Sequence, residues 1–91
     1  MQFEWDAEKA QRNFLKHAVS FDEAITVFSD PLAVTIHDPD LSDREQRFLT
    51  TGLSKRQRLI ILVHTDREGR VRIINAREVT PTERSQYESG E

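Results

Sequence analysis

The sequence of 91 residues contains no cysteine and only three glycines, each of which stands alone. Without cysteine there is no disulfide framework, no thiolate metal site and no thiol nucleophile. Single glycines form no phosphate-binding loop, and the three histidines lack the spacing of metal ligands, so we expect no metal and no cofactor. The longest apolar run, Leu59 to Val63, is too short to span a bilayer, and the first residues lack a signal-peptide pattern. We therefore expect one soluble cytoplasmic domain, residues 1–91, without a membrane partner.

Charge is divided unevenly along the chain, although the net charge is only −3. Residues 1–43 carry three basic and nine acidic side chains, whereas residues 44–77 carry nine basic and three acidic ones. Residues 78–91 carry one basic and four acidic side chains. A basic middle within an acidic protein indicates a local anionic partner, for which nucleic acid and an acidic protein are both candidates.

Sequence periodicity predicts an α+β fold. Apolar residues at helical spacing indicate a helix over residues 7–16, and a capping box begun by Ser20 indicates a second helix to Phe28. After Pro31 the period changes to two, and the expected strands are residues 32–37, 45–51, 59–65 and 70–76. The third of these is the most apolar and is expected at the centre of the sheet. A capping box with proline at the first helical position starts a closing helix over residues 81–87. The expected order is a short β segment, two N-terminal helices, a four-stranded antiparallel meander and a C-terminal helix.

The last predicted strand, Arg72-Ile73-Ile74-Asn75-Ala76-Arg77, has an arginine at each end. The planar guanidinium group suits phosphate, whereas the alternative role is simply the solubility of an edge strand. Residues five apart on a regular strand face opposite sides, so Arg72 and Arg77 share a site only if a bulge redirects one of them. Otherwise the remaining arginine orders the following helix or meets a partner.

Two further groups are candidates for chemistry. Glu45 and Arg47 lie two apart on a predicted strand, which places a carboxylate beside a guanidinium; the alternative is a surface ion pair worth under ~1 kcal/mol. Lys16 and His17 end the first helix, where cations complement the helix dipole. The alternative role for His17 is proton exchange with a substrate near neutral pH. RNA cleavage without metal needs a base for the 2′-hydroxyl, an acid for the leaving 5′-oxygen and positive charge on the pentavalent phosphate. Glu45, His17 and the arginines fit those roles.

Seven motifs follow one another along nearly the whole chain. They are Phe3-Glu4-Trp5-Asp6, Asn13-Phe14-Leu15-Lys16-His17, Phe21-Asp22-Glu23-Ala24, Phe28-Ser29-Asp30-Pro31, Glu45-Gln46-Arg47, Arg72-Ile73-Ile74-Asn75-Ala76-Arg77 and Glu83-Arg84-Ser85-Gln86-Tyr87. As a series they resemble the BrnT family of toxins from bacterial type II toxin–antitoxin modules. The sequence departs from the family's pattern at Ala18, where glycine is typical, and at Asn75, where serine is typical. Ala18 weakens the expectation of a left-handed turn after the first helix.

The resemblance implies a RelE-like fold and a metal-independent endoribonuclease that inhibits translation. It also implies a BrnA-type antitoxin that neutralises the toxin in a hetero-oligomer, expected to be a heterotetramer, and that connects the complex to operator DNA. The expected catalytic residues are His17, Glu45, Arg47, Arg72 and Arg77. The expected RNA-binding residues are Lys16, Lys55, Arg56, Arg58 and Arg84. On this basis the basic middle faces RNA or an acidic antitoxin segment, while the acidic ends stay solvated. The alternatives are a non-catalytic binding module in transcriptional autoregulation and a toxin that acts on a topoisomerase.

Overall fold

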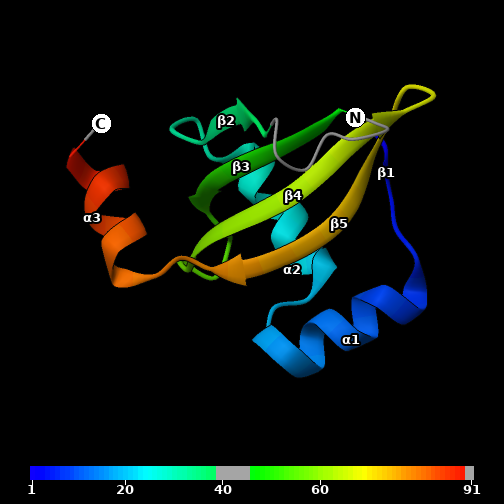
Figure 1. Cartoon of the computed structure of the whole chain (residues 1–91), viewed down its shortest axis with the longest axis horizontal. Coiled ribbons are helices and arrows are strands. Elements are labelled where there is room, and N and C mark those ends of the chain that lie inside the picture. Colours follow the sequence, from blue (N-terminus) through cyan, green and yellow to red (C-terminus); the bar gives the residue numbers. More distant parts are fainter. Residues whose placement is uncertain (39–45, 90–91) are drawn as a thin grey trace.

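A single sheet with helices on one face and at its edges forms the body of the protein (Figure 1). The structure is a computed structural model and describes residues 1–38 and 46–89. Its strands are β1 (Phe3–Glu4), β2 (Val34–His37), β3 (Arg47–Leu53), β4 (Leu59–Arg67) and β5 (Arg70–Glu78). Its helices are α1 (Ala7–His17), α2 (Phe21–Ala24), the 3-10 helix η1 (Ile25–Ser29) and α3 (Pro81–Ser89). In Figure 1, α2 lies behind the sheet, α1 runs along β5, and α3 stands beyond the end of β5.

The α+β class is confirmed, but the four-stranded antiparallel meander is wrong as a description of the whole sheet. The sheet has five strands in the order β1-β5-β4-β3-β2, with the apolar strand β4 at its centre as predicted. The short segment β1 pairs in parallel with β5, through Phe3 with Val71 and Glu4 with Arg72. The sheet is therefore mixed, because the other strands pair in antiparallel fashion.

The second predicted helix differs from the expectation of two N-terminal α-helices. Ser20 caps it as predicted, by accepting a hydrogen bond of 3.0 Å from the backbone N–H of Glu23. The α-helical part ends after four residues, and the chain continues as η1. β-Branched side chains at Ile25, Thr26 and Val27 crowd the helix backbone and disfavour a longer α-helix. The Thr26 hydroxyl also donates to the carbonyl oxygen of Glu23 at 2.6 Å.

A left-handed residue joins α1 to α2, contrary to the expectation drawn from the missing glycine. Ala18 adopts φ 58° and ψ 29°, and its N–H donates to the carbonyl oxygen of Phe14 at 2.8 Å. The turn therefore forms with alanine, at the steric cost that glycine would avoid.

The core lies between the sheet and the helices α2 and η1. Its fully buried side chains include Phe21, Val27, Ile60 and Leu62. Because side chains alternate along each strand, the opposite side of the sheet carries another set. We call this side the open face; on β3, β4 and β5 its residues include Arg47, Leu49, Thr51, Ile61, Val63, Thr65, Arg72, Asn75 and Arg77. None of the helices in residues 1–38 and 46–89 is long and apolar enough to cross a membrane.

Candidate functional site

A β-bulge in β5 decides which arginines share the open face. Ile74 has no partner on β4, because the register of the two strands shifts by one residue at that point. The extra residue reverses the alternation, so that Ile73 and Ala76, three residues apart, both face the core with exposed fractions of 2% and 0%. Arg72 and Arg77, which flank them, therefore both lie on the open face.

Arg47, Thr65 and Arg72 form a row across three strands, which we call the arginine row. Thr65 of β4 pairs with Arg47 on one side and with Arg72 on the other. Neighbouring strands lie about 4.8 Å apart, so the two arginine α-carbons are roughly 10 Å apart and their side chains flank Thr65. Thr65 itself is 1% exposed and donates its hydroxyl to the carbonyl oxygen of Gln46 at 2.5 Å. The row thus places two guanidinium groups on one rigid surface.

Glu4 of β1 extends the arginine row at the Arg72 end. Its carboxylate accepts hydrogen bonds from Arg72 Nη1 at 3.0 Å and from Arg70 Nη1 at 3.4 Å. The hydrogen bond from Arg72 is the main cause that lowers the pKa of Glu4. Glu4 was not predicted as a site residue, because its position depends on the parallel pairing of β1. Glu4 fixes the orientation of Arg72 from the side opposite to Thr65.

Arg77 is engaged with α3. Its Nη1 and Nη2 donate to the two carboxylate oxygens of Glu83 at 2.8 and 3.0 Å. Glu83 also accepts from the backbone N–H of Thr80 at 2.8 Å, which completes the predicted capping box. These contacts, with the Arg77 hydrogen bond first, lower the pKa of Glu83 to about 2. Arg77 therefore orders the start of α3, which is the alternative that the strand spacing left open.

Lys16 and His17 lie in a separate hollow of about 180 Å³ between α1 and β5, which we call the basic pocket. It is lined by Lys9, Arg12, Asn13, Lys16, His17, Ile74 and Asn75. Asn75 belongs both to this pocket and to the open face, so the pocket opens beside the arginine row. Lys9 and Arg12 were not among the site residues predicted from the sequence. Their spacing was the available signal, because Lys9, Arg12 and Lys16 recur at helical intervals and are the only basic residues among residues 1–43.

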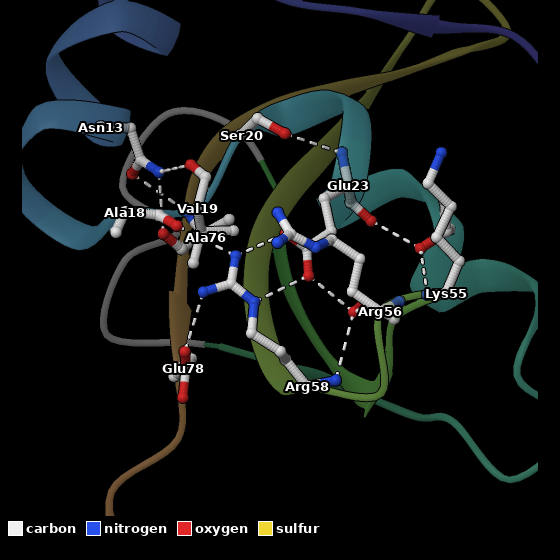
Figure 2. A network of polar contacts seen from close by, with 12 residues as sticks. Asn13, Ala18, Val19, Ser20, Glu23, Lys55, Arg56, Arg58, Ala76 and Glu78 are labelled. Carbon is white, nitrogen blue, oxygen red and sulfur yellow. Dashed lines mark hydrogen bonds and ion pairs between the residues drawn. The ribbon is translucent and has the colours of Figure 1, made fainter.

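Arg58, expected to bind RNA, is the centre of a partly buried polar network (Figure 2). Its Nε donates to Glu23 Oε2 at 2.9 Å, and its Nη2 donates to Glu23 Oε1 and to the carbonyl oxygen of Ala18. Its Nη1 donates to Glu78 Oε1 at 2.9 Å. Glu23 is 4% exposed and also accepts from the Ser54 hydroxyl at 2.7 Å. Arg58 therefore ties α2 and the α1 terminus to β5.

The other residues expected to bind RNA lie away from the arginine row and the basic pocket. Lys55 and Arg56 follow β3 in the turn to β4, where Arg56 Nη1 lies 4.0 Å from Glu23 Oε1. Arg84 is on α3, and its Nε donates to Glu88 at 3.1 Å. Glu45 lies outside the described residues.

The uneven charge along the sequence is in large part an internal pairing. Three carboxylates from the acidic ends hold three arginines of the basic middle: Glu4 with Arg72, Glu23 with Arg58, and Glu83 with Arg77. The expectation that the acidic ends stay solvated is wrong for Glu23, which is buried, whereas Glu4 and Glu83 are paired with arginines but remain partly exposed. No group of three or more acidic or histidine side chains that could hold a metal ion occurs within the described ranges.

An apolar groove of about 450 Å³ lies between α3 and the open face. Val34 and Ile36 of β2, Leu49 of β3 and Ile61 of β4 line it on the sheet side, and Tyr87 lines it on the helix side. Val34 and Ile36 are 51% and 56% exposed. β2 is the last strand in the sheet order, so its outer backbone edge is unpaired among the described strands. An exposed apolar edge strand is a typical place for a partner chain to bind.

Residues 5–83 match the family model described as ribonuclease toxin, BrnT, of type II toxin–antitoxin system. No curated protein matches the chain. Among solved structures, the 1.1 Å crystal structure of the Brucella abortus ribonuclease toxin BrnT is similar, with a TM-score of 0.65 and 19% identity. The similarity covers 88% of this chain and 97% of the Brucella chain. At this level of identity the likeness establishes the common fold.

Proposed function

The chain belongs to the BrnT family of ribonuclease toxins of type II toxin–antitoxin systems, and from this membership we propose that it is a metal-independent endoribonuclease that acts in the cytoplasm and inhibits translation. The observation that carries the proposal is the arginine row. Arg47 and Arg72 stand in register on either side of Thr65, on a face that the core helices leave open. Two guanidinium groups in this arrangement suit one phosphodiester group.

Arg47 and Arg72 stabilise the negative charge that develops on the pentavalent phosphate. They are effective because the sheet and Glu4 hold them in place before RNA binds, so little reorganisation accompanies the reaction. Glu45, which precedes Arg47 by two residues in the sequence, takes the proton of the attacking 2′-hydroxyl. His17 donates a proton to the leaving 5′-oxygen where the basic pocket meets the open face at Asn75. Arg77 holds α3 in place beside this site.

Cleavage of labelled RNA by the purified protein in EDTA tests the proposal. Attack by the 2′-hydroxyl leaves a 2′,3′-cyclic phosphate on one product, which distinguishes it from a metal-dependent hydrolysis that leaves a 3′-hydroxyl. We expect Arg72→Ala to lower the cleavage rate by about 10²-fold to 10³-fold, because this is the usual effect of removing one donor that stabilises the negative charge of a transition state. Arg70→Ala is the matched control, because Arg70 lies on the same strand and contacts the same Glu4 but stands outside the row.

Three outcomes would contradict parts of this mechanism. Loss of cleavage in EDTA would show that the reaction requires a metal ion. An Arg72→Ala protein that is folded and cleaves RNA like the wild type would exclude a catalytic role for the arginine row. Absence of cleavage by the wild-type protein, with retained binding to RNA, would favour a non-catalytic binding module.

We also propose that a BrnA-type antitoxin neutralises the toxin by covering β2 and the apolar groove, which adjoin the arginine row on the open face. The exposed side chains of Val34 and Ile36 and the unpaired edge of β2 support this surface. The resulting hetero-oligomer is a heterotetramer, in which only the antitoxin binds operator DNA. We expect Ile36→Glu to prevent co-purification with the antitoxin while RNA cleavage persists. An unchanged complex would place the antitoxin on another surface.

A further inference from the structure

The basic pocket contains positive charge that the described part of the chain neutralises only in part. Elsewhere Arg58, Arg72 and Arg77 of the basic middle pair with carboxylates. Within the described part of the chain, Lys9 and Lys16 make no ion pair, although Lys9 interacts electrostatically with Asp6 at the start of α1. Arg12 contacts Glu8 at 3.2 Å, but both side chains are more than two-thirds exposed, so water screens the pair. The pocket therefore keeps a positive potential at its mouth.

Helix stability does not explain this cluster. Lys9, Arg12 and Lys16 stand three and four residues apart, the spacings at which like charges on one helix repel each other. Lys16 lies in the last turn, where the helix dipole favours a cation, but Lys9 lies in the first turn, where the dipole disfavours one. The cluster thus weakens α1 in isolation, and an anion in the pocket would remove the repulsion.

The walls of the pocket are fixed before any ligand arrives. Asn13, 6% exposed, donates Nδ2 protons to the carbonyl oxygens of Val19 at 3.0 Å and Ala76 at 2.8 Å. Its Oδ1 accepts from the N–H of Ala76 at 3.2 Å. The amide therefore takes the place of a neighbouring strand along β5 and holds α1 against that strand, as Figure 2 shows. The bulge residue Ile74 and Asn75 complete the opposite wall.

We infer that the basic pocket binds a phosphate group of the RNA strand next to the phosphate held by the arginine row. This inference rests on the proposed function, since it assumes the same RNA. Asn75 lines the pocket and shares the open face with Arg72, about 10 Å away along β5. A single strand that crosses β5 therefore meets Lys9 and Lys16 with one phosphate and the row with another. Lys9 and Lys16 lend affinity and register to the substrate, while the row, with His17 where the pocket meets the open face, acts on the scissile bond.

The test measures binding of a fluorescently labelled, fully 2′-O-methylated single-stranded RNA, which has no 2′-hydroxyl to attack and stays intact. Affinity is measured by anisotropy over a range of salt concentrations for Lys16→Gln and for Gln11→Glu. Both substitutions make the net charge of α1 more negative by one, but exposed Gln11 does not line the pocket. We expect Lys16→Gln to lower the magnitude of the slope of log affinity against log salt by about 0.7, and the affinity at 0.1 M salt by about fivefold. Gln11→Glu leaves the slope unchanged.

Equal changes in the two variants would overturn the inference, because they would reflect net charge alone. An unchanged slope in Lys16→Gln would overturn it too. Binding of inorganic phosphate alone identifies the source of the phosphate: if Lys16→Gln weakens phosphate binding but leaves RNA binding unchanged, the pocket serves free phosphate and the RNA assignment is wrong. The binding assay does not depend on cleavage, so an inactive wild-type protein would refute the proposed nuclease and leave this test intact. In an active protein, Lys16→Gln raises KM and leaves kcat unchanged.

Discussion

Replacing Arg58 with methionine is expected to destabilise the fold by about 3 kcal/mol. The substitution removes both guanidinium contacts to Glu23, a carboxylate that is 4% exposed. Breaking a buried ion pair by removing one partner costs about 3–5 kcal/mol. The lower end applies because the Ser54 hydroxyl still donates to Glu23 at 2.7 Å and Arg56 lies within 4.0 Å. With a urea m-value of about 1.5 kcal/mol/M, the denaturation midpoint at pH 7 falls by about 2 M.

The pH dependence of stability and a double variant distinguish the loss of the ion pair from a simple packing defect. Arg58 holds the pKa of Glu23 below its usual value of 4.5, so the pair stabilises the protein above that pH. As the pH falls below 4.5 this stabilisation is lost, and the gap between wild type and Arg58→Met narrows. Adding Glu23→Gln removes the buried charge and restores part of the stability. An Arg58→Met protein with the wild-type midpoint and weakened RNA binding would refute the argument and return Arg58 to the RNA-binding residues.

Three further predictions follow from single contacts. Ala18→Gly relieves the strain of a left-handed alanine at φ 58°. We expect the free energy of unfolding to increase by about 1 kcal/mol, which raises the melting temperature by about 4–8 °C. A lower melting temperature would show that the methyl group makes stabilising contacts. Glu83 has a pKa of about 2, so its pairing with Arg77 stabilises the protein above pH 4.5 and is lost as the pH falls toward 2. Both side chains are about one-third exposed, so screening leaves about 1–2 kcal/mol, and NMR titration should show the Glu83 pKa rising in Arg77→Gln. Burial lowers the pKa of His64 below 6.5, so the free energy of unfolding, measured in urea, decreases as the pH falls from 6.5 until the folded-state pKa is passed. His64→Asn should remove this pH dependence. A wild-type free energy of unfolding that stays constant over this pH range would contradict the prediction.

Local signals allowed the elements to be predicted from the sequence, whereas their pairing could not be. The capping boxes begun by Ser20 and Thr80 mark the starts of α2 and α3, because side chain and backbone there interact within three residues. The apolar run of β4 indicated its central position, since a central strand is buried most completely. β1 has two residues, too few for a periodic pattern, and only the finished sheet gives Phe3 and Glu4 their partners.

The candidate site shows the same limit. Arg47 and Arg72 were candidates by residue type, but their common row depends on the register of β3, β4 and β5. The contacts of Arg58 could not be predicted, because its partner in the fold, Glu23, lies 35 residues away in the sequence. The cluster around Lys16 was partly accessible, since helical spacing alone places Lys9 and Arg12 on the same face.

The bulge at Ile74 connects these features through one residue. Without it, alternation along β5 from Arg72 would turn Arg77 toward the core, where a guanidinium would lose Glu83 and meet the apolar side chains under α2. The same change would move Ala76 away from Asn13, whose amide bonds both backbone groups of that residue, and so loosen α1 at the basic pocket. The position of α3, the attachment of α1 and the presentation of Asn75 beside the arginine row therefore depend on the same irregularity. A bulge placed in the middle of a well-paired strand gives this arrangement a rigidity that a loop of equal length lacks, and the phosphate recognition proposed for the arginine row and the basic pocket requires such rigidity.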